Sequence, residues 1–174
     1  MGPSGVSFFE FATVERGVYV RAHGHANMNN SHLFRDLIES LLDQGRRLFV
    51  IDLAQCAGMD STFMGVLVGI AMYEADPPEA ARPRTMLVNV AEHCARQLGA
   101  LGLEHLIQVR EAALGVPEGV EFERLEERPS EPRSRVKMIE EAHRHLVRVN
   151  DRNAALFGPL LSTLASELAA SPDA

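Results

Sequence analysis

The fold is decided by residues 48–73, which read LFVIDLAQCAGMDSTFMGVLVGIAMY. Leu48 to Leu53 form a short and almost continuously apolar run, which is typical of a strand covered on both faces. Thr62 to Tyr73 are apolar almost all the way round a helix, so we predict a helix with much of its surface covered. A loop from Ala54 to Met59 then delivers Asp60 and Ser61 to the start of that helix.

The residues upstream predict a hairpin and a helix. Val18, Val20 and Ala22 alternate with polar residues, as in a half-buried strand, and the apolar residues from Phe8 to Val14 supply its hairpin partner. Ser31 is placed to cap a helix that ends at Gly45. The stripe at helical spacing that supports this helix consists of Phe34, Leu37, Ile38 and Leu41.

Two further strands and a helix are expected downstream. Met86 to Val88 and Leu106 to Val109 are short apolar runs. Asn89, with Glu92 three residues later, is typical of a capping box for a helix that ends at Gly102. Strands that alternate with helices after an opening hairpin predict an α/β fold, with a mixed β-sheet flanked by helices.

The C-terminal third has a different composition. We expect a sheet domain over residues 1–110, an acidic, proline-containing linker over 111–134, and a C-terminal helical extension over 135–170. Within the linker, Val120 to Leu125 suggest a strand. The extension carries apolar residues at alternating spacings of three and four, the pattern of a coiled-coil seam.

Gly158-Pro159 is predicted to interrupt the extension, with a second short helix following. Asn153 lies on the seam, and two interpretations of it stay open. A buried asparagine there would set the register of a homodimer formed through the C-terminal helix. Alternatively, the helix packs back on its own domain and Asn153 is exposed.

Composition and charge exclude several classes of function. The 24 acidic and 17 basic residues give a formal charge of −7, so no basic surface for nucleic acid is indicated. Cys56 and Cys94 are too few for a disulfide framework or a cysteine zinc site. Neither a signal peptide nor a membrane-spanning run is evident, so we expect a cytoplasmic protein without direct membrane insertion. The single lysine, Lys137, follows no glycine-rich loop, which excludes a P-loop.

Ser61 is the most informative polar residue. At the start of a helix its hydroxyl lies among unpaired backbone amides, at the positive end of the helix dipole, where a phosphate would be stabilised. The alternative is that Asp60 or Ser61 is merely the helix cap, which is a common role for both residue types.

The pattern resembles the STAS domain of bacterial anti-sigma factor antagonists. The resemblance runs from about Phe8 to Arg110. It rests on three groups of residues: Ile51-Asp52-Leu53, then Asp60 to Leu67, then Leu98 with Gly102-Leu103.

The resemblance implies a binding switch that is not an enzyme and needs no cofactor. Ser61 would be the phosphoacceptor of an anti-sigma factor serine kinase, and a serine phosphatase would reverse the modification. The unphosphorylated protein would bind that kinase and free a sigma factor. The docking surface would consist of Asn27, Asn29, Asn30, Ser31, Asp60, Thr62, Phe63, Met64 and Gly65.

One departure from the family's commonest motif stands out. This chain has Thr62-Phe63-Met64 where the family has Ser-Gly-Leu, while Gly65 is retained. Phe63 in the first turn would either narrow access for a kinase or supply a binding anchor.

Two other chemistries have little support. His23, His25 and His32 with Asp36 have metal-ligand residue types, but a His-x-His pair is a weak signal, so we expect no metal site. A serine nucleophile elbow needs a glycine two residues before Ser61, where Met59 stands. His143 and His145 are two apart on a helix and point in different directions, so they form no ligand pair.

Two rival functions stay open. One is a STAS scaffold or signalling subunit that is never phosphorylated and assembles through its C-terminal helices. The other is a STAS subunit of a membrane transport system.

Overall fold

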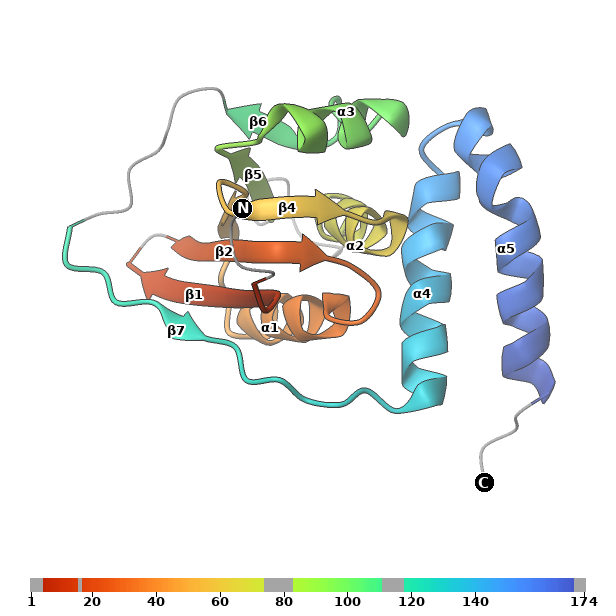
Figure 1. Ribbon diagram of the computed structural model, residues 1–174, viewed down its shortest axis with the longest axis horizontal. Coiled ribbons are helices and arrows are strands. Elements are labelled where there is room, and N and C mark those ends of the chain that lie inside the picture. Colours follow the sequence, from red (N-terminus) through yellow and green to blue (C-terminus); the bar gives the residue numbers. More distant parts are fainter. Residues whose placement is uncertain (1–4, 16, 74–82, 111–117, 171–174) are drawn as a thin grey trace.

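The computed structural model describes residues 5–15, 17–73, 83–110 and 118–170 (Figure 1). Its strands are β1 (Phe8–Val14), β2 (Gly17–Ala26), β3 (Leu48–Asp52), β4 (Cys56–Met59), β5 (Arg84–Val88), β6 (Gln108–Arg110) and β7 (Glu123–Arg124). Its helices are α1 (Ser31–Asp43), α2 (Ser61–Ala71), α3 (Glu92–Ala100), α4 (Pro132–Val147) and α5 (Asp151–Ala170).

The strands form a mixed sheet in the order β6-β5-β3-β2-β1-β7, and β4 also pairs with β2. The opening hairpin pairs β1 with β2 antiparallel, whereas β2, β3, β5 and β6 run parallel to one another. Strand β7 adds to the outer edge of β1 through the pairs Glu10↔Arg124 and Phe11↔Glu123. The expected α/β fold, a mixed sheet flanked by helices, is confirmed.

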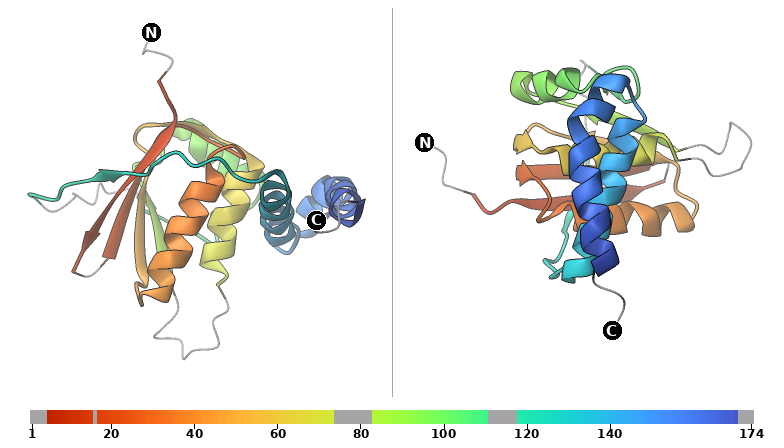
Figure 2. Two further views of the ribbon diagram at one scale, coloured as in Figure 1. Left: turned by 90° about the horizontal axis from the view of Figure 1, so that it is seen from below. Right: turned by 90° about the vertical axis from the view of Figure 1, so that its right-hand side faces the viewer.

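Helices α1 and α2 lie side by side against one face of the sheet (Figure 2). Three aromatic rings join these layers: Phe9 from β1, Phe34 from α1 and Phe63 from α2, each at most 1% exposed. Their ring centroids lie 5.1 to 5.7 Å apart. Burial of rings of this size supplies much of the free energy that holds the start of α2 against the sheet.

The C-terminal extension forms a helical hairpin that packs on α2. Figure 2 shows α4 against α2, and α5 outside α4, so the layers run from sheet to α2 to α4 to α5. The inward stripe of α4 consists of Met138, Ile139, Ala142 and Leu146. The apolar stripe whose spacing predicted packing against another helix therefore packs against α2 and α5 of the same chain.

The hairpin turns at a different place from the one that the sequence indicated. Helix α5 continues through Gly158 and Pro159, and the break falls at residues 148–150. The reason is the cap: the Asn150 side-chain Oδ1 accepts from the Asn153 backbone amide at 2.8 Å, which starts a new helix at Asp151. The prediction of an interruption at Gly158-Pro159 is wrong.

Three other local predictions are wrong. Ser31 does not cap α1: it is the first residue of that helix, and the N-cap residue, Asn30, makes no side-chain capping bond. The expected loop from Ala54 to Met59 contains β4, whose Met59 exchanges backbone hydrogen bonds with the Gln97 side-chain amide at 2.8 and 3.1 Å. Asn89 is not part of a capping box: it has a positive φ of 53° and its side chain donates to Asp52 Oδ1 at 3.0 Å. Helix α3 is capped at Ala91 without a side-chain bond.

Candidate functional site

Asp60 is the residue that organises the start of α2. As the helix N-cap, its carboxylate Oδ1 accepts from the Phe63 backbone amide at 2.9 Å. Its second oxygen, Oδ2, accepts from the Met28 amide at 2.8 Å. One side chain thus joins the beginning of α2 to the loop after β2, and the expected capping role of Asp60 is confirmed.

The loop that Asp60 holds is itself well bonded. Ser31 donates to the Asn27 carbonyl through its amide at 2.9 Å and its hydroxyl at 2.7 Å. Asn30 accepts from the Asn27 amide at 2.9 Å and donates to the His25 carbonyl at 2.8 Å. These bonds keep Met28, which is 40% exposed, at the surface beside the N-terminus of α2.

Ser61 contacts a histidine from α4 that lies 82 residues away in the chain. Its hydroxyl Oγ lies 2.9 Å from Nε2 of His143. The other ring nitrogen, Nδ1, lies 2.7 Å from the Ile139 carbonyl, which can only accept, so Nδ1 carries the proton. In the neutral ring Nε2 is then an acceptor, and Ser61 donates to it.

The environment favours this neutral form of His143. The side chain is 2% exposed, and this burial lowers its pKa from the usual 6.5 because the charged ring would lose its water. The Ile139 carbonyl and the negative charge of Asp60 act in the opposite direction, but burial is the largest effect. Ser61 itself is only half-buried.

Two glycines let α4 approach α2 closely. A Cβ atom on Gly65 would lie 2.6 Å from the carbonyl carbon of Ala142, which is backbone and cannot rotate away. A Cβ on Gly69 would collide with the His145 ring, whose Nδ1 lies 3.3 Å from the Gly65 carbonyl. Small residues on α2 therefore fit the contact with α4.

The structure places the nine predicted docking residues in the loop after β2, at the first residue of α1 and at the start of α2, but it buries five of them. Asn29 is exposed, and Asn27, Asn30 and Asp60 are half-buried. The buried ones are Ser31, Thr62, Phe63, Met64 and Gly65. Their roles in binding remain predictions.

Phe63 lies in the core. It is 0% exposed, and its ring packs between Phe9 and Phe34. Both sequence interpretations, an anchor or an obstacle to a kinase, required an exposed ring, and neither fits this arrangement. The substitution of a smaller family residue by phenylalanine fills the space between α2, α1 and β1.

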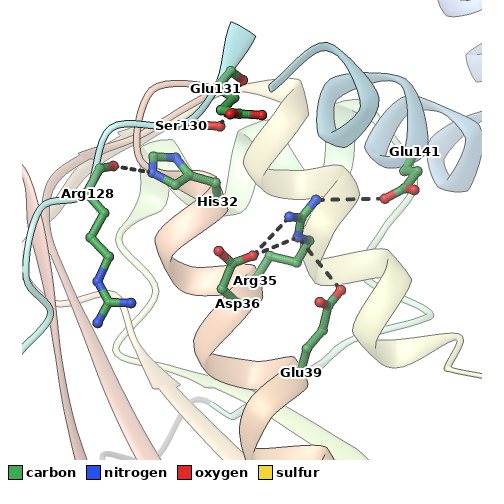
Figure 3. A network of polar contacts seen from close by, with 8 residues as sticks. All are labelled: His32, Arg35, Asp36, Glu39, Arg128, Ser130, Glu131 and Glu141. Atoms are coloured by element: carbon green, nitrogen blue, oxygen red, sulfur yellow. Dashed lines mark hydrogen bonds and ion pairs between the residues drawn. The ribbon is translucent and has the colours of Figure 1, made fainter. Parts of the chain in front are cut away.

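The hairpin is also linked to α1 by charged side chains (Figure 3). The Arg35 guanidinium lies 2.9 Å from Asp36, 3.7 Å from Glu39 and 3.8 Å from Glu141 of α4. These carboxylates are largely exposed, so each pair contributes little, on the order of 0–1 kcal/mol.

The histidines with metal-ligand residue types have separate partners. His23 Nε2 lies 3.1 Å from Glu10, and its ring stacks on Phe8. His32 Nε2 lies 2.7 Å from the Arg128 carbonyl, to which it donates (Figure 3). Among the residues that the structure describes, no three His, Cys, Asp or Glu side chains are grouped to hold a metal ion.

Asn153 has an environment that neither of the two sequence interpretations described. The hairpin packs on its own domain, yet Asn153 is 0% exposed. Its side-chain amide donates to the Leu101 carbonyl at 3.0 Å and to the Leu146 carbonyl at 3.1 Å. It joins the turn of the hairpin to the end of α3.

Sequence reasoning missed the structural partner of Ser61. The different directions of His143 and His145 exclude a shared ligand but do not identify what either ring contacts. No signal local to residues 143–145 indicates Ser61, because the contact depends on the packing of α4 on α2.

The comparisons with known proteins agree with this fold. A candidate anti-sigma factor antagonist from Thermotoga maritima is 21% identical, with a TM-score of 0.51 over 59% of this chain and 86% of that chain. An anti-sigma factor antagonist from Mycobacterium paratuberculosis is 17% identical, with a TM-score of 0.50 over 64% of this chain and 91% of that chain. Bacillus SpoIIAA in its phosphorylated form is 24% identical, with a TM-score of 0.46 over 59% and 91%.

A search of curated proteins gives no match. None of the helices within residues 5–15, 17–73, 83–110 and 118–170 has the length and apolarity to cross a membrane. A family model for the STAS domain matches residues 9–113, which is more than half of the chain and includes both the loop after β2 and α2. The chain therefore belongs to the STAS domain family.

Proposed function

We propose that this protein is an anti-sigma factor antagonist, a binding switch controlled by phosphorylation of Ser61. The observation that carries the proposal is the position of this serine. It follows the N-cap Asp60, whose carboxylate ties the start of α2 to the loop at Met28. Any partner that docks at this corner would contact the loop and the modified serine together.

A phosphate at Ser61 would change this corner strongly. It adds about −1.5 to −2 charges and three acceptor oxygens. The N-terminal end of α2 would stabilise part of that charge, while the neighbouring Asp60 carboxylate would oppose it. A partner surface that fits the unphosphorylated site would have to bury the phosphate, which costs free energy. We therefore expect phosphorylation to weaken binding.

The proposed partner is an anti-sigma factor serine kinase, with a serine phosphatase to reset the switch. Support comes from membership of the STAS family, together with solved relatives that are described as anti-sigma factor antagonists. In this scheme the unphosphorylated protein holds the kinase and thereby frees a sigma factor. The scheme assigns the protein no catalytic step of its own and places it in the cytoplasm.

The test uses the 174-residue chain, ATP and a bacterial anti-sigma factor serine kinase. Mass spectrometry of the peptide from Asp60 to Leu67 should find one phosphate on Ser61, and none after Ser61→Ala. A second serine variant, Ser166→Ala on the exposed side of α5, should be phosphorylated at Ser61 like the wild type. A phosphate elsewhere, or kinase binding that is unaffected by modification of Ser61, would overturn the proposal.

A second candidate is a STAS scaffold that is never phosphorylated. One observation favours it: α4 packs on α2 and crosses it at Gly65, so part of the expected docking surface is already occupied. This candidate predicts that Ser61→Asp leaves partner binding unchanged, whereas the switch predicts a loss of binding.

A further inference from the structure

The α2 face beneath α4 has the features of a receptor for a helix. Gly65 and Gly69 form a shallow track, and Ser61 lies at its N-terminal end. Ala142 of α4 crosses directly over Gly65, so the crossing point requires a small residue on the incoming helix. Amphipathic helices that bind in grooves use such a stripe at spacings of three and four.

We propose that the α4–α5 hairpin is an intramolecular ligand for this face, and that the protein partner displaces it with an amphipathic helix of its own. The proposal rests on the proposed function in one respect, since it assumes that the partner uses α2. Four observations support it, concerning the attachment of the hairpin, its tether, the polar groups at the contact and the pairing of its two helices.

The hairpin is attached mainly through one helix contact. The principal neighbours of α4 are α2 and α5, while that of α5 is α4 (Figure 1). Further polar links among the described residues include the amide side chains of Asn150 and Asn153 to the Leu101 carbonyl, and the exposed Arg35–Glu141 pair. A unit held by one interface can separate without opening the sheet.

The tether allows this separation. The chain before α4 is held to the sheet by the two residues of β7 and by the Leu125 amide, which donates to the Phe9 carbonyl at 2.9 Å. These contacts lie on β1, on the far side of α1 from the hairpin, as Figure 2 shows. Nearer to α4, the Arg128 carbonyl accepts from His32 of α1 at 2.7 Å, so the free tether runs from residue 129 to the start of α4. These contacts can remain formed while α4 leaves α2.

The contact itself contains polar groups that water can satisfy. The Ser61 hydroxyl, the His143 ring and the Gly65 carbonyl are bonded across the interface. When the hairpin leaves, each of these groups regains hydrogen bonds to water, so opening is opposed less than at a purely apolar interface of equal area.

The hairpin would move as one piece. The ring of Phe157 packs edge-on against His143 at 4.9 Å, and Asn153 bonds to the Leu146 carbonyl. Both contacts lie within the hairpin and stay intact when it separates. The released α2 face is then free for a helix of matching shape.

The test measures whether α4 binds this face in trans. The probe is a fluorescent synthetic peptide of residues 132–149, followed by anisotropy. The protein is the full-length chain with Ala142→Arg, which prevents the tight crossing over Gly65. The matched control is Ala155→Arg, the same change at an exposed position of α5.

We expect Ala142→Arg to bind the peptide at least about tenfold more tightly than the wild type, because the competing segment no longer occupies the face. Ala155→Arg should bind like the wild type. A peptide that itself carries Ala142→Arg should not bind. Equal peptide affinity for all three proteins would overturn the proposal.

A measurement on the wild type covers the case in which Ala142→Arg fails to fold. Amide hydrogen exchange in low urea reports the free energy of opening for each element. This free energy should depend less on urea for α4 and α5 than for β2 and β3. Exchange of all four elements in a single cooperative step would overturn the proposal. Neither experiment involves a kinase or a phosphate. A negative result in either one can therefore be told apart from a negative result in the phosphorylation test of the proposed function.

Discussion

At the scale of single residues, the pair formed by Ser61 and His143 connects a predicted modification site with the C-terminal hairpin. The bond has a direction, because Nδ1 of His143 is used on the Ile139 carbonyl and Nε2 can only accept. Ser61 must therefore supply a proton to the bond. Any change that removes that proton acts on the hairpin as well as on α2.

Replacing Ser61 by alanine should destabilise the protein by about 1–3 kcal/mol, because it leaves the buried Nε2 of His143 without a donor. Urea unfolding of the two proteins measures the difference. Ser166→Ala removes an exposed hydroxyl on α5 and should change stability by less than about 0.5 kcal/mol. Equal stability of the two variants would show that the contact with His143 contributes nothing.

Asn153→Ala should cost a similar amount, about 1–3 kcal/mol, since it leaves the carbonyls of Leu101 and Leu146 without this donor. The exposed Asn29 serves as the control, with little effect expected from Asn29→Ala. Thermal unfolding of both variants gives the comparison. A loss no larger than that of the control would contradict the anchoring role assigned to Asn153.

The sequence allowed some of these residues to be identified and not others. Asp60 and Ser61 could be placed at a helix start because capping is a local property of a polar residue before an apolar run. His143 could not be linked to Ser61, because the 82 residues between them are brought together by packing. Asn150 was identifiable in principle, as an asparagine directly before an acidic residue at a helix start.

At the scale of helices, the contact of α4 with α2 depends on the absence of side chains at two positions. Gly65→Ala should destabilise the protein by about 1–3 kcal/mol, because the added methyl meets the backbone of Ala142. Gly99→Ala in α3 is the matched control. Apart from the adjoining backbone of α3, no atom of the described residues lies within 4 Å of the place that a methyl group on Gly99 would take, so alanine should stabilise the helix by up to about 1 kcal/mol.

Opposite signs for these two alanine variants in urea unfolding would support the tight crossing of α2 and α4. A stabilising effect of Gly65→Ala would contradict it, because the helix propensity gained would then exceed any cost of contact.

The same helix contact should respond to pH. Burial lowers the pKa of His143 and of His145 below 6.5, so the docked state binds protons less readily than the unfolded chain. The contribution of the two neutral histidines to the free energy of unfolding is therefore complete above the unfolded pKa of 6.5. It is lost as the pH falls below that value. The charge of Asp60 raises the pKa of His143. Glu141 raises the pKa of His145 and Arg148 lowers it, but burial is the largest effect on both rings.

Unfolding free energies measured between about pH 7.5 and 5 should thus decrease toward acid, and His143→Gln should reduce that slope. His105→Gln, at an exposed position after α3, is the control and should leave the slope as in the wild type. An unchanged slope in His143→Gln would contradict the assignment of a neutral, buried ring.

Periodicity identified α1 from its regular apolar spacing, whereas α2 was predicted from a run that is apolar almost all the way round. Periodicity missed β4, which has four residues including a glycine and whose pairing with β2 is interrupted by a register shift between Gly24 and His25. Pro159 suggested a helix end, yet α5 continues through it. The helix boundary was set by the cap at Asn150 rather than by the proline.

At the scale of the whole molecule, a STAS domain carries a second helical layer on α2, the helix at which we propose that a partner docks. The sheet class, the covered strands and the helices of the sheet domain followed from sequence pattern alone. The placement of the extension did not, since a seam of apolar residues fits equally a second copy or a helix of the same chain. The close approach at Gly65 and Gly69 shows that α2 is shaped for α4.

We expect the phosphorylation state of Ser61 to control whether the α4–α5 hairpin stays packed on α2. The most direct measurement is hydrogen exchange of the protein carrying phosphoserine at position 61, compared with the unmodified protein and with phosphoserine at the exposed Ser166, all at one pH near neutrality. A phosphorylated Ser61 has no hydroxyl proton to donate to His143, and its charge would face the acceptor nitrogen of a neutral ring. We predict faster exchange in α4 for the Ser61-modified protein alone, with β2 and β3 unchanged. Identical protection of α4 in all three proteins would contradict this prediction.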